Sequence, residues 1–217
     1  MAPHRPLRMV GRHAFYGVIS GAQDGGSDAM VETMTMDGRL APDEIRALVR
    51  TVPDFPVPGI QFRDITTVIG HPRALASSVH HLADMAKEGG AEDIAGMEAR
   101  GFIFGAAVSI ALGTGFIPVR KPGKLPVEVI GVDYDLEYGT DRLEMDPGAI
   151  RPGQKVSIVD DLVATGGTAL AAVELLRRAG AVVEQALFVI DLPDLGGARR
   201  LREAGVDVRT LMEFEGG

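Results

Sequence analysis

The chain has 217 residues, of which 24% are charged and 46% hydrophobic, a balance ordinary for one globular domain with an appendage. It contains no Cys, which excludes disulfides, thiolate metal sites and a Cys nucleophile and is compatible with a cytoplasmic location. The formal net charge of −8 argues against a nucleic-acid partner, because phosphate backbones demand a basic surface, and no apolar run approaches the length of a membrane span.

Residues 1–35 differ in composition from the rest of the chain. They contain a Gly-rich polar stretch, their charges cancel, and no apolar period is sustained. We therefore expect a disordered N-terminal extension, followed by one folded domain over residues 36–217. Met34 or Met36 is a hypothetical start of translation, and a transit peptide is the alternative function of the segment.

The first ordered elements are expected after residue 40. Pro42, followed by two acids, predicts a helix that ends before Pro53. Residues 53–65 contain three prolines and a glycine, which predict an extended, turn-rich path without a ladder of backbone hydrogen bonds. A second helix is expected over residues 72–88, where apolar residues recur at helical spacing before two glycines.

Two further strands each deliver positive charge at their carboxyl end. Residues 93–97 read as a buried strand, and Arg100 stands between it and a helix over residues 103–112. The apolar strand 115–119 ends in the densest basic cluster of the chain, Arg120-Lys121-Pro122-Gly123-Lys124. A solvated loop is the usual interpretation of such a cluster, but in an acidic chain we favour a binding site for a polyanion.

Residues 127–145 alternate between hydrophobic and polar side chains around Tyr138-Gly139-Thr140-Asp141. This alternation predicts a two-stranded antiparallel flap, which we place over residues 121–146 as a whole.

The central stretch, Lys155–Leu170, carries the strongest chemical signal. A β-branched strand at Val156–Val159 is followed by Asp160 and Asp161, and the turn Ala164–Thr168 then opens a helix. Glycine backbone, threonine hydroxyls and the free N–H groups of a helix amino terminus make an anion site. The carboxylates would repel a phosphate and suit sugar hydroxyls or a metal ion instead. An ordinary strand-turn-helix with a solvated acidic end is the alternative.

The remaining elements complete an α/β architecture. Residues 182–190 and 206–214 read as strands, and residues 195–204 as a helix with solvated arginines. Strands alternating with helices from residue 93 onward predict a mostly parallel twisted sheet flanked by helices. Ligands then bind at the carboxyl ends of the strands, where the cations and the acid pair are placed.

Residues 156–168 resemble the phosphoribosyl-pyrophosphate signature of the type I phosphoribosyltransferases. The resemblance implies that Asp160 and Asp161 hold the ribose hydroxyls and that the following loop holds the 5-phosphate. The loop residues are Ala164, Thr165, Gly166, Gly167 and Thr168. The implied pyrophosphate ligands are Arg100, Arg120, Lys121 and Lys124, with Arg120 reaching toward a neighbouring subunit.

Residues 55–65 resemble the adenine-specific members of that family. The resemblance implies a small N-terminal hood, residues 40–70, in which the Gln61 backbone reads the adenine edge, Phe62 packs on the ring and Arg63 lies nearby. Leu192 is expected under the base. A backbone donor and acceptor at this place would mismatch a 6-oxopurine. In the flap, Glu137 is the expected catalytic carboxylate that manages the proton of adenine.

The implied reaction joins adenine to 5-phosphoribosyl 1-pyrophosphate and yields AMP and pyrophosphate. Mg²⁺ is expected to enter on the substrate rather than on direct protein ligands, and a homodimer without membrane or nucleic-acid partners is expected. Two alternatives remain open: transfer to another base (xanthine, guanine or orotate), and a non-catalytic relative that only senses nucleotides.

Overall fold

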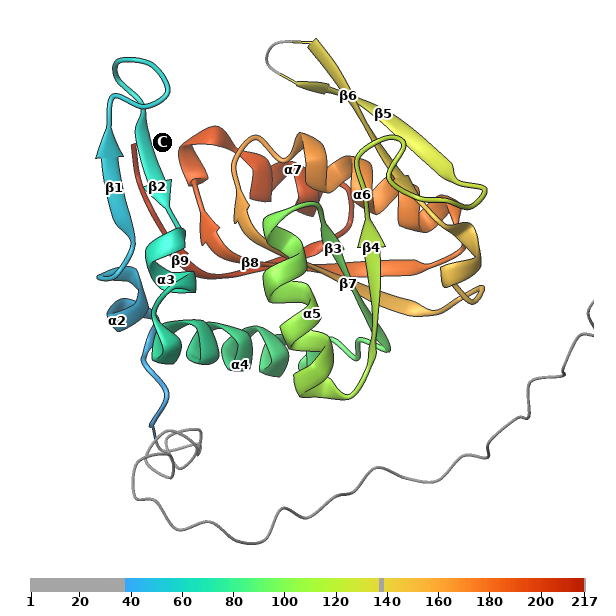
Figure 1. The fold of residues 1–217 in the computed structure, drawn as a ribbon, viewed down its shortest axis with the longest axis horizontal. Helices are drawn as coiled ribbons and strands as arrows, with labels where there is room; N and C mark the ends of the chain where they lie inside the picture. The colour runs from blue at the N-terminus through green and yellow to red at the C-terminus, as the bar shows by residue number, and fades with distance from the viewer. Residues whose placement is uncertain (1–37, 137–138, 217) are drawn as a thin grey trace, which may run out of the picture. The chain divides into compact units, whose positions relative to one another are not determined.

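The computed structural model describes residues 38–136 and 139–216, in which a parallel five-stranded sheet has the order β4-β3-β7-β8-β9 (Figure 1). The strands are β3 (Asp93–Met97), β4 (Gly115–Val119), β7 (Lys155–Val163), β8 (Val182–Asp191) and β9 (Asp207–Glu213). All neighbouring pairs in this sheet run parallel. The predicted α/β fold with a mostly parallel sheet is therefore confirmed.

Helices cover both faces of the sheet (Figure 1). The helices α4 (Pro72–Glu88) and α5 (Arg100–Leu112) pack on one face, and α6 (Gly167–Arg178) and α7 (Gly197–Glu203) lie on the other. Successive residues of a strand serve opposite faces, so Ile158 joins the core under α6 while Val159 joins the core under α4 and α5. This double burial explains the continuous apolar runs of the strands.

Some helices and strands have the predicted bounds, and others differ from the prediction. The elements α4, β3 and β4 have the predicted bounds, whereas α5 begins at Arg100 and places that arginine in the first turn of the helix. The helix α7 begins at Gly197, later than predicted, because a 3₁₀ turn over Pro193–Leu195 precedes it.

The acid pair lies inside β7, which continues to Val163, beyond the two carboxylates at which the sequence predicts its end. Pairing between β7 and β8 continues through Asp160 with Phe188 and through Leu162 with Ile190. Because this ladder continues on both sides of the acid pair, backbone hydrogen bonds to β8 hold that part of β7 in the sheet.

The hood, residues 40–70, contains α2 (Pro42–Arg46), β1 (Arg50–Pro53), β2 (Gln61–Asp64) and α3 (Thr66–Ile69). The helix α2 ends before Pro53, as predicted, and β1 begins four residues after it. The expectation of no backbone ladder is wrong, since β1 and β2 pair in antiparallel register. The prolines fall at the end of β1 and in the connecting loop, so Gln61–Asp64 keeps its N–H donors for pairing.

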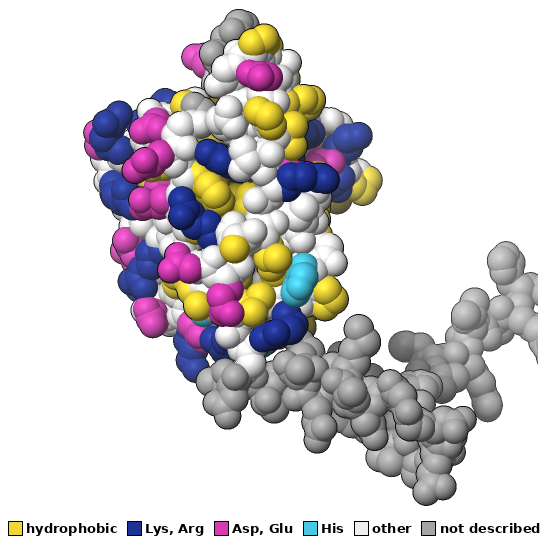
Figure 2. Space-filling view, turned by 90° about the vertical axis from the view of Figure 1, so that its left-hand side faces the viewer, with side chains coloured by type: hydrophobic (Ala, Val, Ile, Leu, Met, Phe, Trp, Pro, Cys, Tyr) yellow, Lys and Arg dark blue, Asp and Glu magenta, His cyan; other side chains and the backbone are white. Residues whose placement is uncertain are grey.

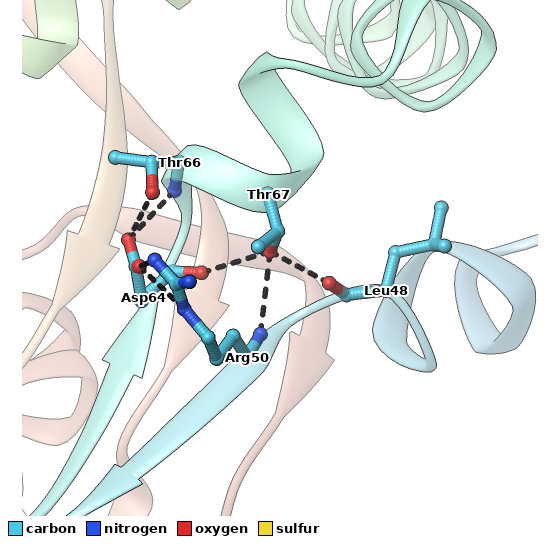
Figure 3. Close-up of polar contacts among 5 residues, drawn as sticks. All are labelled: Leu48, Arg50, Asp64, Thr66 and Thr67. Carbon is cyan, nitrogen blue, oxygen red and sulfur yellow. Dashed lines mark hydrogen bonds and ion pairs between the residues drawn. The ribbon is translucent and has the colours of Figure 1, made fainter.

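Hydrogen bonds to Asp64 connect β2 with β1 and α3 in the hood (Figure 3). The Oδ1 of Asp64 accepts a hydrogen bond from the Thr66 backbone N–H at 2.9 Å, and its Oδ2 accepts from Arg50 Nε at 3.0 Å. Thr67 Oγ1 donates to Leu48 O at 2.6 Å. The hydrogen bonds from Thr66 first, and from Arg50 next, lower the pKa of Asp64 from 3.8 to about 2.

The flap is an antiparallel pair of β5 (Ile130–Leu136) and β6 (Gly139–Met145), which confirms the predicted hairpin. Leu136 pairs with Gly139, so Gly139, Thr140 and Asp141 belong to β6. Backbone hydrogen bonds of 2.8 Å in both directions between Arg120 and Glu144 join the flap to the end of β4. Val132 and Leu143 are buried in the core under α6.

The face that carries the hood has a mixed surface charge. Basic and acidic side chains are interspersed over it, without an extended basic patch (Figure 2). Within the two described ranges, no helix combines the length and the apolar character needed to cross a bilayer. The expectation for residues 1–35 lies outside the described residues.

The low pKa of Asp64 predicts a pH-dependent contribution to stability. Because the folded-state pKa is depressed, the contribution is complete above about pH 4 and is lost as the pH falls toward about 2. Asp64→Asn should lower the free energy of unfolding at pH 7 by on the order of 1 kcal/mol. Thermal melts at pH 7, 4 and 2 should show the deficit shrinking with acid.

The matched control is Asp43→Asn, which neutralises an exposed acid of the same hood. A deficit of Asp64→Asn that stays constant from pH 7 to pH 2 would contradict the assignment.

Candidate functional site

A cavity of about 270 Å³ opens at the carboxyl ends of β3, β4 and β7. Its lining residues come from three separate stretches of the chain. They are Met97, Glu98, Ala99, Arg100, Lys121, and the run from Asp160 to Ala169. The cavity therefore brings together the acid pair, two of the predicted cations and the whole Ala164–Thr168 loop.

The Ala164–Thr168 loop connects β7 to α6. Gly166 is the N-cap of α6 and has a φ of +82°, a left-handed conformation that favours glycine. A Cβ at Gly166 would also lie 2.9 Å from the Cα of Gly197, so the position has no room for a side chain. The first turn of α6 then presents unpaired N–H groups and the positive end of its dipole to the cavity. This arrangement suits an anion.

The two acids of β7 have different surroundings. Asp161 is 5% exposed and forms an ion pair with Arg100, the first residue of α5. Asp160 Oδ1 accepts from the Asp161 backbone N–H at 2.8 Å, and within residues 38–136 and 139–216 no cation forms an ion pair with it. Burial first, and the charge of Asp161 next, raise the pKa of Asp160 well above its ordinary value. Asp160 therefore suits hydroxyl donors or a cation supplied by a ligand.

The two cations of the cavity are held by carboxylates. Burial disfavours the charged guanidinium of Arg100, but the hydrogen bond to Asp161 and the negative charges of nearby carboxylates together outweigh that effect, so its pKa is raised. Lys121 Nζ forms an ion pair with Asp141 and donates to Tyr134 Oη at 2.9 Å. These flap contacts outweigh the effect of burial and raise the pKa of Lys121 as well. Both side chains remain positively charged at neutral pH.

Two predicted pyrophosphate ligands lie outside the cavity lining. Arg120 Nε donates to Glu98 Oε2 at 3.1 Å, and the guanidinium lies 5.6 Å from the centre of the Phe102 ring. The hydrogen bond from Arg120 lowers the pKa of Glu98, with a further one from the Lys121 backbone N–H. Lys124 is exposed.

The predicted adenine contacts also lie outside the lining of this cavity. Gln61 and Phe62 are in β2, where Phe62 is 39% exposed and packs edge-to-face against Phe55 at 5.1 Å between ring centroids. Leu192 is buried, and its N–H donates to Val163 O at 3.1 Å.

Arg63, the remaining predicted adenine contact, is held by the C-terminal segment. Its guanidinium lies 4.8 Å from the centre of the Phe214 ring and donates to Glu215 O at 2.8 Å. The expected catalytic Glu137 lies outside the described residues.

Sequence reasoning did not find the flap partners of Lys121. Tyr134 and Asp141 are directly opposite each other in the register of β5 and β6, and therefore share one face of the hairpin. The alternation of the flap sequence contains this signal once the hairpin register is known. Because a shift of one residue moves a side chain to the other face, the register had to come from the structure.

Comparisons with known proteins agree with this geometry. The profile of the phosphoribosyl transferase domain matches residues 72–211. The adenine phosphoribosyltransferase of Erythrobacter litoralis is 70% identical over 174 residues, which cover 80% of this chain and 98% of that protein.

Two solved structures are similar to the fold. One is the adenine phosphoribosyltransferase of Thermoanaerobacter pseudethanolicus, with a TM-score of 0.76 at 45% identity over 80% of this chain and 100% of that one. The other is the Saccharomyces cerevisiae enzyme complexed with an imino-altritol bisphosphate and adenine, with a TM-score of 0.73 at 38% identity over 79% and 98% of the two chains. Fold, cavity and relatives lead to one conclusion: the chain belongs to the adenine phosphoribosyltransferase family.

Proposed function

We propose that the cavity binds 5-phosphoribosyl 1-pyrophosphate and positions its ribose for attack by adenine, which yields AMP and pyrophosphate. The observation that carries this proposal is the composition of the lining. An anion-binding loop, two cations and three carboxylates, namely the acid pair and Glu98, surround one cavity of about 270 Å³. Such a set matches a ligand with a phosphate at one end, hydroxyls in the middle and a pyrophosphate at the other.

The ribose phosphate would be held by β7 and the turn that follows it. The loop residues Ala164, Thr165, Gly166, Gly167 and Thr168 would hold the 5-phosphate through N–H and hydroxyl donors. Asp160 and Asp161 would accept hydrogen bonds from the ribose hydroxyls. The acid pair lies in β7 and the loop follows directly after this strand. Binding energy from contacts far from C1 would therefore hold C1 in place for the reaction.

The leaving pyrophosphate would lie against Arg100 and Lys121. Both line the cavity and remain charged, so they can stabilise negative charge as the bond to C1 breaks. Lys121 would exchange its contacts with Asp141 and Tyr134 for the pyrophosphate. Lys124, which is exposed, and Arg120, which pairs with Glu98, are proposed as outer contributors on the basis of the resemblance.

Mg²⁺ would enter this site on the pyrophosphate of the substrate. Within the described part of the chain, no group of three or more His, Asp or Glu side chains is arranged to hold a metal ion by itself. Asp160, partly buried and without an ion-pair partner there, fits a cation or a hydroxyl that arrives with the ligand. When bound, Mg²⁺ would neutralise part of the charge of the leaving group.

The hood would supply adenine specificity. The backbone of Gln61 would read the edge of the base, and the half-exposed ring of Phe62 offers an apolar face for it. Leu192 would lie under the base, and Arg63, held by Phe214 and Glu215, would lie nearby. A 6-oxopurine would leave a buried donor or acceptor unpaired, which disfavours it strongly.

Glu137 would manage the imidazole proton of adenine from the flap, between β5 and β6. Closure of the flap would exclude water that could hydrolyse the activated sugar. A homodimer and a cytoplasmic location stay predictions, which sedimentation and localisation of the native protein test.

Product analysis tests the proposed reaction directly. The protein mixed with adenine, 5-phosphoribosyl 1-pyrophosphate and Mg²⁺ should yield AMP, whereas hypoxanthine, guanine, xanthine and orotate should be used at least about 10³-fold less efficiently in kcat/KM. A preference for any of these other bases would contradict the assignment of the hood.

Substitutions in the acid pair should affect activity and thermal stability differently. Asp160→Asn and Asp161→Asn should each lower kcat/KM for the activated sugar by about tenfold or more, because each loses a charged acceptor for a ribose hydroxyl. The two variants should differ in thermal stability. Asp161→Asn should melt lower, since it loses the ion pair with Arg100.

Asp160→Asn should melt higher than the wild type near neutral pH. Because the folded state raises the pKa of Asp160, ionisation of this residue destabilises the fold increasingly as the pH rises above about 4. The gain in melting temperature should therefore appear above that pH and vanish below it. Equal melting temperatures of the variant and the wild type at pH 8 would refute the electrostatic account.

Glu137→Gln should lower kcat by about 10²-fold while the KM for adenine changes little, because proton transfer and not binding is removed. Steady-state kinetics measure this split. A defect confined to KM would exclude the proton-handling role.

A further inference from the structure

The helix α7 begins directly behind the Ala164–Thr168 loop. The backbone N–H of Gly197, its first residue, donates to Ala164 O at 2.9 Å. A Cβ built on Gly197 would lie 2.7 Å from the Gly166 N, closer than any real side chain allows. Glycine at this position therefore lets the backbone of α7 touch the backbone of the loop.

Arg200, one turn further along α7, makes the second contact. Its Nη1 donates to Thr165 O at 2.8 Å. The carbonyl oxygens of two successive loop residues, Ala164 and Thr165, are thus both hydrogen-bonded to α7. Arg200 does not line the anion cavity itself.

Binding these two carbonyls also orients the N–H groups of the loop. In a trans peptide the C=O and the N–H point in opposite directions from a rigid plane. The peptide that carries Ala164 O also carries the N–H of Thr165, and the peptide that carries Thr165 O carries the N–H of Gly166. With both oxygens held toward α7, these two N–H groups are directed away from it, and Thr165 and Gly166 line the cavity.

A rotated peptide would have the opposite effect on an anion. A carbonyl oxygen turned into the cavity would place negative partial charge against a phosphate and would remove an N–H donor. The loop therefore favours an anion only as long as its hydrogen bonds to α7 keep both carbonyl oxygens out of the cavity.

We propose that Arg200 is a positioning residue for the 5-phosphate: by holding the carbonyl of Thr165, it keeps the N–H of Gly166 directed into the anion site. The inference rests on the proposed function of the cavity. The alternative is a solvated helix arginine, since Arg200 is exposed. The side chain of Arg199, its exposed neighbour, has no hydrogen bond or ion pair to any residue of the described ranges, so Arg199 serves as the matched control.

The experiment compares Arg200→Gln with Arg199→Gln, which remove the same charge from the same helix. Arg200→Gln should raise the KM for 5-phosphoribosyl 1-pyrophosphate about fivefold to tenfold, with kcat and the KM for adenine within about twofold of the wild type. Arg199→Gln should match the wild type in all three constants. Arg200→Lys, which keeps one donor on a long side chain, should recover part of the loss.

The melting temperatures separate positioning from folding. Because Arg200 is exposed, both Gln variants should melt within about 2 °C of the wild type. Equal KM values for the sugar in the two Gln variants would overturn the proposal, and so would a loss of kcat accompanied by a clear fall in melting temperature.

A direct binding measurement keeps the test independent of turnover. Calorimetric titration with ribose 5-phosphate should show Arg200→Gln binding about fivefold to tenfold more weakly than Arg199→Gln. A wild type that formed no AMP from adenine would refute the proposed reaction. The affinities of the two variants for ribose 5-phosphate would still test the role of Arg200. Equal affinities of the two variants would reject that role even in an active enzyme.

Discussion

Two adjacent carboxylates inside a buried strand are the constraint on which the site depends. Asp160 and Asp161 belong to β7, whose pairing with β8 continues past both residues to Val163, so the backbone keeps the two acids side by side. Asp161 forms an ion pair with Arg100, whereas burial first, and the charge of Asp161 next, raise the pKa of Asp160. The site thus holds electrostatic strain that a ligand rich in hydroxyls or carrying a cation would relieve. Stability and binding oppose each other at this position.

The anion end of the cavity depends on backbone contacts rather than on side chains. Gly166 adopts a left-handed conformation, and Gly197 brings α7 against the loop from behind. The oxygens of Ala164 and Thr165 are hydrogen-bonded to α7. A peptide group that is held at its oxygen has a fixed N–H direction, so the loop is arranged for an anion before any anion binds. Such preorganisation reduces the entropy that binding would otherwise lose.

The flap and the hood are attached to the sheet by polar contacts. Lys121 links the cavity to the flap through Tyr134 and Asp141, and Arg63 links the hood to Phe214 at the end of β9. Arg63 and Lys121 both lie half-exposed at edges of the core. Polar contacts at such places contribute little to stability and can be exchanged for a ligand. The rigid anion loop and the polar attachments of the flap and the hood therefore come from different parts of the fold.

The sequence by itself determined the elements whose signals are local. Apolar periodicity predicted α4, β3, β4 and the parallel sheet, and the contiguous stretch from β7 into α6 predicted the anion loop, because all its groups are neighbours along the chain. Only the tertiary structure decided the contacts between distant residues: Arg100 with Asp161, Lys121 with Asp141, the ladder between β1 and β2, and Arg200 with Thr165. An arginine on a short helix has the same sequence pattern whether it faces water or a carbonyl. Which of these it meets depends on how the helix crosses its neighbour, and no local period specifies that crossing.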